Sequence, residues 1–236
     1  WNAKPVGTLA LGSVFSTLQV VPLILQTLEA WRMQRMPHQL ANKTSPTSRS
    51  SLFALPGVFL YLLGVNFWNF LGAGVFGLII NLPIANYYEH GTYLTVNHGH
   101  AALMGVYGNL SIAGILFALR FLVHPNSWNH RLVKFSFWSI NLGLMSMLVL
   151  DLFPAGLHQL FTVMDQGYWF ARSQEFIQST PFQTMTWLRI VGGSIFLLGG
   201  VLPLTWMVLK SAINLKTDQP FVLNRFHQER KEVEVY

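Results

Sequence analysis

Two histidines separated by one glycine, His98 and His100, are the side chains in this sequence best suited to bind a metal. They lie near the start of a stretch of mostly small and apolar residues, TVNHGHAALMGVYG at residues 95–108. Imidazole is a common ligand of transition metals and the usual axial ligand of haem iron. Successive helical residues turn by about 100°, so side chains two positions apart project from nearly opposite faces of a helix. The spacing therefore favours two separate metals or haems over one shared ion.

The residues that follow the pair would suit a flat cofactor, because small and aromatic side chains leave an apolar slot for a haem. The residues expected to form this slot are Ala101, Ala102, Gly105, Tyr107 and Gly108. The simpler alternative is that both histidines are interfacial residues at a frayed helix start. Ionisable groups inside a membrane segment usually have a function, however, and no other charged residue follows before Arg120. This context favours the ligand interpretation.

The composition is that of an integral membrane protein. Of the 236 residues, 52% are hydrophobic and 10% are charged, whereas about 25% are charged in an average soluble domain. The absence of cysteine excludes disulfides, thiolate metal sites and cysteine nucleophiles. The formal charge of +6 does not indicate nucleic-acid binding, because the Lys and Arg residues lie between apolar runs instead of clustering on one face.

Five apolar stretches are long enough to cross a bilayer core as helices, which takes roughly 20 residues each. Within lipid only a helix or a closed barrel satisfies its backbone hydrogen bonds. The sequence therefore predicts one all-α transmembrane domain over residues 1–236, a polytopic helix bundle. The expected spans are about 8–30, 57–81, 94–119, 133–153 and 184–209. Asp151, just before Pro154, is expected to cap the fourth span or to face the interface, with proton handling as the alternative.

Basic residues predict how the bundle is oriented. Cytoplasmic connections of membrane proteins carry an excess of Lys and Arg. Here that excess lies in two loops and in the tail after Lys210; the loop residues are Arg32, Arg35, Lys43, Arg49, Arg120 and Arg131. The pattern predicts an N-terminus outside, a C-terminus in the cytoplasm, and His98 and His100 near the outer end of the third span.

The run FWNFLGAGVFGLIINLPIANYYEHGTYLTVNHGHAALMGVYGNL, residues 67–110, resembles the catalytic subunit of quinol-dependent nitric oxide reductases in the haem-copper oxidase superfamily. LGSVFSTLQVVPLILQTLEAW near the start and TWLRIVGGSIF near the end resemble the same family. The resemblance covers essentially the whole chain, as the C-terminal part of a longer subunit. It implies a fold of the subunit I type in a bacterial inner membrane, nitric oxide as substrate, and a remaining N-terminal part of the same subunit as partner.

The resemblance also implies roles for the histidines. His98 would be the proximal ligand of the high-spin haem b3, and His100 would ligate the low-spin haem b. The family's non-haem iron and the second ligand of haem b are held by residues that would lie upstream of Trp1, so this chain would supply one axial ligand to each haem. Arg189, just inside the outer end of the last span, lies at a depth where it could pair with haem propionates. An interfacial anchor is an equal alternative for Arg189.

One position departs from the reductase pattern. The family has a glutamate at the end of an FSxxE motif beside the non-haem iron, and here that residue is Gln19. An amide keeps the shape of a carboxyl group but loses its charge and acidity. Such a substitution resembles the nitric oxide dismutases, which split two NO into N2 and O2 without external protons or electrons. Gly193, where relatives have an acidic residue, is a weaker second departure. Gln19 is therefore the expected catalytic-site residue of a dismutase.

Three alternatives stay open. A quinol-dependent reductase that forms N2O could take its protons by another route, with quinol as a further partner. A non-enzymatic b-type electron carrier would use the haem ligands without NO chemistry. In a transport or scaffold segment the histidines would only form hydrogen bonds.

Overall fold

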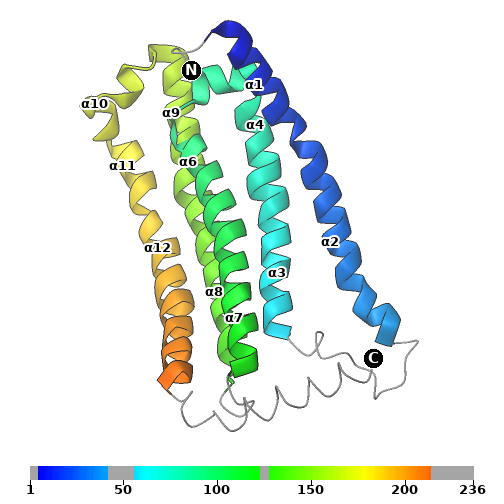
Figure 1. Cartoon of the computed structure of the whole chain (residues 1–236). Helices are drawn as coiled ribbons and strands as arrows, with labels where there is room; N and C mark the ends of the chain where they lie inside the picture. Colours follow the sequence, from blue (N-terminus) through cyan, green and yellow to red (C-terminus); the bar gives the residue numbers. More distant parts are fainter. Residues whose placement is uncertain (1–4, 42–55, 123–127, 214–236) are drawn as a thin grey trace.

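The computed structural model describes residues 5–41, 56–122 and 128–213, and every regular element within these ranges is a helix (Figure 1). Five of the described helices are long and apolar enough to cross a membrane. The predicted all-α membrane bundle is thereby confirmed. We number the spans in chain order, and they are Ala10–Arg32, Gly57–Asn81, Tyr93–Leu119, His130–Gln166 and Thr180–Ile213. The loop residues Lys43 and Arg49 and the tail after Ile213, which helped to predict the orientation, lie outside the described residues.

Most spans are built from two α-helical halves. The first span joins α1 (Val6–Leu18) to α2 (Val20–Ala41), and Gln19 lies at their junction. The remaining halves, in order, are α3 (Pro56–Trp68), α4 (Gly77–Asn81), α6 (Tyr93–Gly99), α7 (Asn109–Leu122), α8 (His130–Met147), α9 (Phe153–Gln166), α11 (Thr180–Trp187) and α12 (Arg189–Ser194). Two short helices, α5 (Pro83–Glu89) and α10 (Gln174–Ile177), lie at the end of the bundle where the chain begins (Figure 1).

The second to fifth spans each contain a π-helical segment. These segments are Asn69–Phe76, His100–Gly108, Leu148–Leu152 and Ile195–Val201. π-Helical turns are rare, and they occur frequently at functional sites because the wider turn redirects side chains. Three polar residues discussed below, Asn69, His100 and Asp151, lie in these turns.

The fourth span is the most buried of the five. In its most apolar 18-residue stretch 56% of the residues are buried, against 6% in the first span. The first span packs against the second and leans away from the rest of the bundle (Figure 1). The fourth span runs on to Gln166, past the end near residue 153 expected from Pro154. Pro154 comes two residues after the π-helical turn Leu148–Leu152, and Leu152 keeps helical backbone angles (φ −64°, ψ −42°), so the helix continues through the proline at an irregular turn.

A buried polar network fixes the rotation of the third span. The Trp68 indole N–H donates to Asn141 Oδ1 at 2.7 Å, which ties the second span to the fourth. Asn109 of the third span exchanges hydrogen bonds with Asn141 at 3.1 and 3.2 Å, and its Nδ2 also donates to the Gly105 carbonyl. Polar side chains hydrogen-bond across helices in lipid and so hold them in one register. The network therefore determines which way the faces bearing His98 and His100 point.

The fourth and fifth spans approach each other closely at two glycines. A Cβ placed on Gly192 would lie 2.6 Å from the Gly143 carbonyl oxygen, and one on Gly143 would lie 2.6 Å from the Phe196 nitrogen. Small residues allow such backbone contact between membrane helices. The next residue, Gly193, has nothing within 4 Å of an added Cβ. The pair Gly143 and Gly192 therefore serves packing, whereas Gly193 does not.

We expect Gly192→Ala to destabilise the bundle by about 1–3 kcal/mol, because the added methyl group has no space between the two backbones. Gly193→Ala is the matched control and should leave stability close to the wild-type value. Circular dichroism during denaturant unfolding in detergent micelles measures both variants. Equal destabilisation by the two substitutions would contradict the packing role of Gly192.

Candidate functional site

His98 is held in the orientation and tautomer of a metal ligand. Its Nδ1 atom lies 2.8 Å from the Gly72 carbonyl oxygen of the second span. Because a carbonyl only accepts hydrogen bonds, Nδ1 carries the hydrogen, and Nε2 keeps a free lone pair. A Cβ on Gly77 would lie 3.1 Å from the ring, so the absence of a side chain there makes room for the imidazole. Metal-bound histidines usually have this arrangement, with the second ring nitrogen bonded to a carbonyl or carboxylate.

His98 lines a cavity of about 440 Å³ between the first three spans. Gln19 lines the same cavity, so the structure brings together two residues that are 79 positions apart in the sequence (98 − 19). Of the five residues expected to form a cofactor slot, Ala102 and Tyr107 line this cavity. The expectation was wrong for two others: Ala101 packs on Gly72, and Gly105 packs on the Trp68 ring. Both residues form part of the packing contact between the second and third spans.

The cavity is polar but almost without ionisable groups. Four carboxamide side chains line it: Gln19, Gln26, Asn69 and Asn81. Among the lining residues that the structure describes there is no Asp, Glu, Lys or Arg, and only His98 and Tyr107 can titrate. The cavity therefore offers hydrogen-bond donors and acceptors to a ligand but no carboxylate that could deliver protons.

Asn69 is a site residue for which the sequence offered only an ambiguous signal. It is 9% exposed, and it lines the cavity. Asn81, the other carboxamide that the second span contributes to the cavity, donates to the Gly77 carbonyl at 2.7 Å. A buried amide costs free energy unless a protein group, a ligand or water satisfies it. The Asn69 amide is therefore available to a ligand of the cavity.

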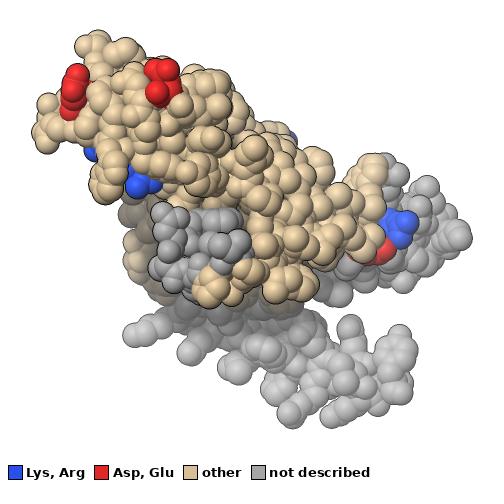
Figure 2. All heavy atoms as spheres, turned by 90° about the horizontal axis from the view of Figure 1, so that it is seen from above, with Lys and Arg blue, Asp and Glu red and all other residues tan. Residues whose placement is uncertain are grey.

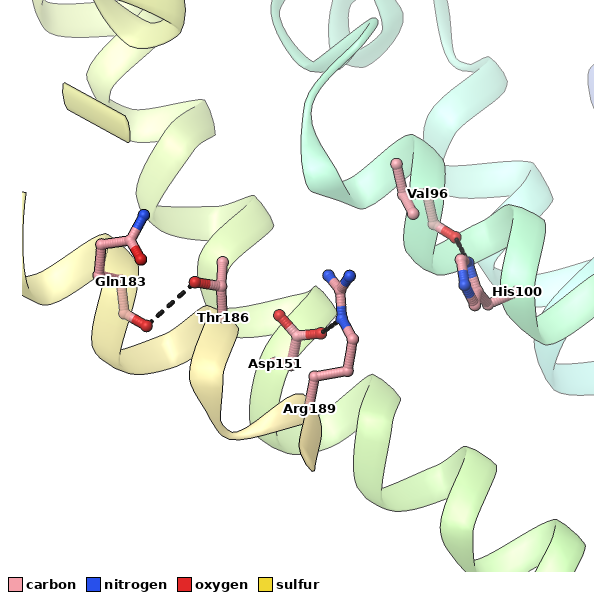
Figure 3. A network of polar contacts seen from close by, with 6 residues as sticks. All are labelled: Val96, His100, Asp151, Gln183, Thr186 and Arg189. Atoms are coloured by element: carbon pink, nitrogen blue, oxygen red, sulfur yellow. Dashed lines mark hydrogen bonds and ion pairs between the residues drawn. The ribbon is translucent and has the colours of Figure 1, made fainter. Parts of the chain in front are cut away.

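His100 does not line the cavity of His98, although the two residues are only two positions apart. Its Nδ1 atom lies 3.0 Å from the Val96 carbonyl of its own helix, which again leaves Nε2 with the free lone pair (Figure 3). The structure thus places the two imidazoles in separate surroundings, as the spacing of the pair predicts.

Arg189 of the fifth span reaches across to Asp151 of the fourth (Figure 3). Its Nε atom lies 2.6 Å from Asp151 Oδ2, and its guanidinium group lies 5.7 Å from the centre of the Tyr93 ring on the third span. Asp151 is fully buried, and its Oδ1 has no partner among the described residues. The expectation that Asp151 caps a helix or faces the interface was therefore wrong. Its position in an apolar stretch was the available signal, because acids inside a membrane are costly unless they are paired.

Arg189 also borders open space. It lines a cavity of about 560 Å³ along the fifth span, together with Gln183, Ser194 and Gly193, and 46% of its side chain is exposed. The pairing with Asp151 uses Nε, which leaves the rest of the guanidinium group for a second acceptor. A guanidinium fork suits a carboxylate such as a haem propionate. Because the buried Asp151 holds Arg189 in place, Arg189 fits the role of an interfacial anchor less well.

We expect Asp151→Asn to destabilise the bundle by about 2–3 kcal/mol. Removing one partner of a fully buried ion pair costs about 3–5 kcal/mol. The loss expected here is no larger than the low end of that range, because Arg189 is half exposed. The double variant Asp151→Asn/Arg189→Gln should recover most of the loss, since it leaves no unpaired charge. Denaturant unfolding in micelles gives the free energy of unfolding of the two single variants and of the double variant. A double variant as unstable as the sum of the two single variants would contradict an energetically coupled pair.

Among the described residues, side chains that could bind a metal do not form a cluster. No three His, Asp or Glu side chains converge in residues 5–41, 56–122 and 128–213 in a way that could hold an ion. The donors nevertheless fit haem, because two imidazoles with free Nε2 atoms serve separate spaces and Arg189 offers a cation. A single nitrogen ligand from one helix is what the axial position of a haem requires.

Comparison with known proteins agrees with these features. Residues 1–195 match the family model described as cytochrome c and quinol oxidase polypeptide I. The chain is also 30% identical over 205 residues to a subunit of the nitric oxide reductase of Stutzerimonas stutzeri, an alignment that covers 84% of this chain and 40% of that protein. The chain therefore spans about two fifths of the length of this curated relative. Since the family match takes in the first four spans, both histidines and α12, this multi-pass membrane protein belongs to the haem-copper oxidase subunit I family.

Proposed function

We propose that the chain is part of a membrane enzyme that converts nitric oxide, and that the reaction is dismutation of two NO to N2 and O2. The observation that carries this proposal is the cavity shared by His98 and Gln19, whose described lining includes four carboxamides and no carboxylate. The name of the relative, a nitric oxide reductase subunit, supports NO as the substrate. The reactive centre would combine haem b3 with a non-haem iron, whose ligands lie outside the described residues.

The family resemblance suggests roles for the residues, and their geometry supports these roles. His98 would hold haem b3 through Nε2, with the Gly72 carbonyl fixing its ring, and His100 would hold haem b through its own Nε2. Arg189, fixed by Asp151, would bind a haem propionate. When bound, the high-spin haem would supply an iron that can coordinate NO. Gln19 and Asn69 would hydrogen-bond the bound substrate in the cavity.

Stoichiometry explains why the missing carboxylate matters. Reduction of two NO to N2O and water consumes two protons and two electrons, so the site must receive protons. Dismutation of two NO to N2 and O2 balances without either. An amide hydrogen bonds but does not titrate near neutral pH. A cavity in which Gln19 replaces the family's glutamate is therefore better matched to dismutation, and haem b would then be structural or idle.

Quinol-dependent reduction to N2O is the second candidate. It is favoured by the name of the relative, and it would use haem b on His100 to deliver electrons from quinol. It requires a proton route that does not depend on residue 19. A b-type electron carrier or a scaffold would leave the 440 Å³ cavity at His98 without a purpose.

Gas analysis separates the two candidates. The full-length protein is purified from membranes and supplied with 15N-labelled NO in the absence of an electron donor. Labelled N2 together with O2 supports dismutation. Labelled N2O that forms only when reduced quinol is added would overturn the dismutase assignment and support the reductase.

We also propose an orientation in a bacterial inner membrane, with the N-terminus outside and the C-terminus in the cytoplasm. The end of the bundle that bears α5 and α10 would then face outward. Viewed from this end, charged side chains are sparse and stand apart on a largely uncharged surface (Figure 2). A sparse distribution of basic residues is typical of the outer side.

A further inference from the structure

The ion pair between Arg189 and Asp151 is isolated from other charged side chains (Figure 3). The third span, which packs beside it, contains no Asp, Glu, Lys or Arg. On the fourth span the nearest other charged residues are Lys134 and Asp165, and the next on the fifth span is Lys210. Among the described residues, the pair therefore provides the fixed charges at this level of the bundle.

The pair lies on the face of the third span that carries His100. The Arg189 guanidinium group lies 5.7 Å from the centre of the Tyr93 ring. Tyr93 precedes His100 by seven residues (100 − 93), about two helical turns, so these two side chains project from nearly the same face. His98 follows Tyr93 by five residues (98 − 93), about 140° around the helix, and lines the other cavity. The ion pair therefore belongs to the surroundings of His100 and not to those of His98.

The two charges of the pair differ strongly in exposure. Arginine is permanently protonated in proteins, so the 2.6 Å contact between Arg189 Nε and Asp151 Oδ2 joins a cation to an acid. The Asp151 side chain is completely buried, whereas 46% of the Arg189 side chain is exposed. Exposed charges are screened by water and salt, and buried charges are screened much less. The negative charge of Asp151 therefore acts on its surroundings more strongly than the positive charge of Arg189.

The second carboxylate oxygen of Asp151 strengthens this imbalance. Asp151 Oδ1 is buried and accepts no hydrogen bond from the described side chains or backbone. Only Oδ2 is compensated, by Arg189. An acceptor in a low-dielectric interior that has no donor keeps its full field. The pair is neutral in sum, but its field nearby is that of an incompletely offset negative charge.

We propose that Asp151 is a positioning residue that lowers the reduction potential of the haem bound by His100. It holds the Arg189 guanidinium group through Nε, and it offsets the positive charge that Arg189 would otherwise present to a haem propionate. The proposal rests on haem binding by His100 as proposed above, and it does not depend on which reaction takes place at the other haem.

The sign of the effect follows from electrostatics. Reduction adds an electron to a haem, so a nearby cation favours the reduced form and a nearby anion disfavours it. Burial and the polar groups around a haem are among the means by which a protein sets its potential. An unpaired Arg189 would make the haem on His100 easier to reduce. With Asp151 in place, the same haem is harder to reduce.

A haem that is hard to reduce fits a reaction without external electrons. Under the proposed dismutation the haem on His100 does not need to pass electrons, and a low potential keeps it oxidised in the presence of quinol. In a quinol-dependent reductase the same buried acid would oppose electron entry. Asp151 thus acts in the same direction as Gln19, because one disfavours delivery of electrons and the other disfavours delivery of protons.

Redox titration of the full-length protein in detergent, followed through the optical band of the reduced low-spin haem, tests the proposal. We expect Asp151→Asn to raise the midpoint potential by about 59 mV or more, which corresponds to about tenfold in the one-electron equilibrium. The double variant Asp151→Asn/Arg189→Gln removes both charges, so its potential should lie between those of the wild type and Asp151→Asn. The haem on His98 should shift less, because His98 lies on the other face of the third span.

Two further variants complete the test. Asp151→Ser also removes the charge, and its smaller side chain leaves room for water beside Arg189, so this variant should fold and should also raise the potential. Asp165→Asn is the matched control, since it makes the same change at an exposed residue near the end of the same span. It should leave the potential at the wild-type value.

An unchanged or lowered potential in both Asp151→Asn and Asp151→Ser, in protein that remains folded by circular dichroism, would overturn the proposal. This is also the result expected of a purely structural Asp151, because a loss of stability does not by itself move a midpoint potential. An equal rise in Asp165→Asn, or an equal shift of both haems, would overturn it as well. These outcomes leave haem ligation by His100 intact, whereas a wild type without a low-spin haem would overturn that ligation and this proposal together.

Discussion

We expect His98→Ala to remove the high-spin haem and to leave the low-spin haem in place, and we expect His100→Ala to have the reverse effect. Each substitution deletes one Nε2 donor, and the two imidazoles serve separate spaces, so the losses should be independent. The haem content should fall from two to about one per protein in each variant, because a haem without its protein axial ligand is weakly held. A pyridine haemochrome assay on the purified full-length protein gives the content, and optical spectra with added CO identify which haem remains.

His130→Ala provides the control, because His130 is an exposed histidine at the start of α8, away from both sites. It should retain both haems. Retention of both haems in His98→Ala and in His100→Ala would refute the ligand assignment. Loss of both haems together in either variant, in a protein that remains folded by circular dichroism, would refute their independence.

Gln19→Glu should suppress donor-independent formation of labelled N2 by about tenfold or more and should allow N2O to form when a reductant is present. The substitution places a carboxyl group in a cavity whose other described polar lining residues are neutral amides, a serine, a histidine and a tyrosine. A carboxylate next to the reacting NO can relay protons, which favours the proton-consuming reaction. Headspace mass spectrometry of 15N-labelled gases, with and without reduced quinol, measures both products.

The same amide-to-acid change at Gln166, an exposed residue at the end of α9, is the matched control. It should leave the ratio of N2 to N2O unchanged. A wild-type protein that forms only N2O, together with a Gln19→Glu variant that forms it faster, would show that the chain is a reductase whose proton route Gln19 impairs. An unchanged product ratio in Gln19→Glu would show that residue 19 does not determine the reaction.

Elements that depend on local pattern were predictable from the sequence. The five spans follow from runs of apolar residues that only a helix can carry through lipid, and the separate surroundings of His98 and His100 follow from helical rotation between neighbours. The end of the fourth span was not predicted, because whether Pro154 stops a helix depends on the turn in which it falls.

Features that depend on contacts between distant residues were not predictable. Asp151 and Arg189 are 38 positions apart, and their pairing requires the fourth and fifth spans to meet at Gly143 and Gly192. Ala101 and Gly105 were expected to border a cofactor, but their role depends on where the second span packs. The burial of Glu89 depends on how α1 covers the end of α5.

The hydrogen bond between His98 and Gly72 limits how evolution can adjust this centre. The acceptor belongs to the main chain, so no side-chain replacement at residue 72 deletes it. A carboxylate in that place would make the imidazole a stronger electron donor, but a Cβ on Gly72 would already collide with the backbone of Ala101. Under the proposed haem ligation, the electron-donating strength of His98 would therefore be adjusted by small shifts of the second helix against the third, so that the separation of two helices would tune the bound iron.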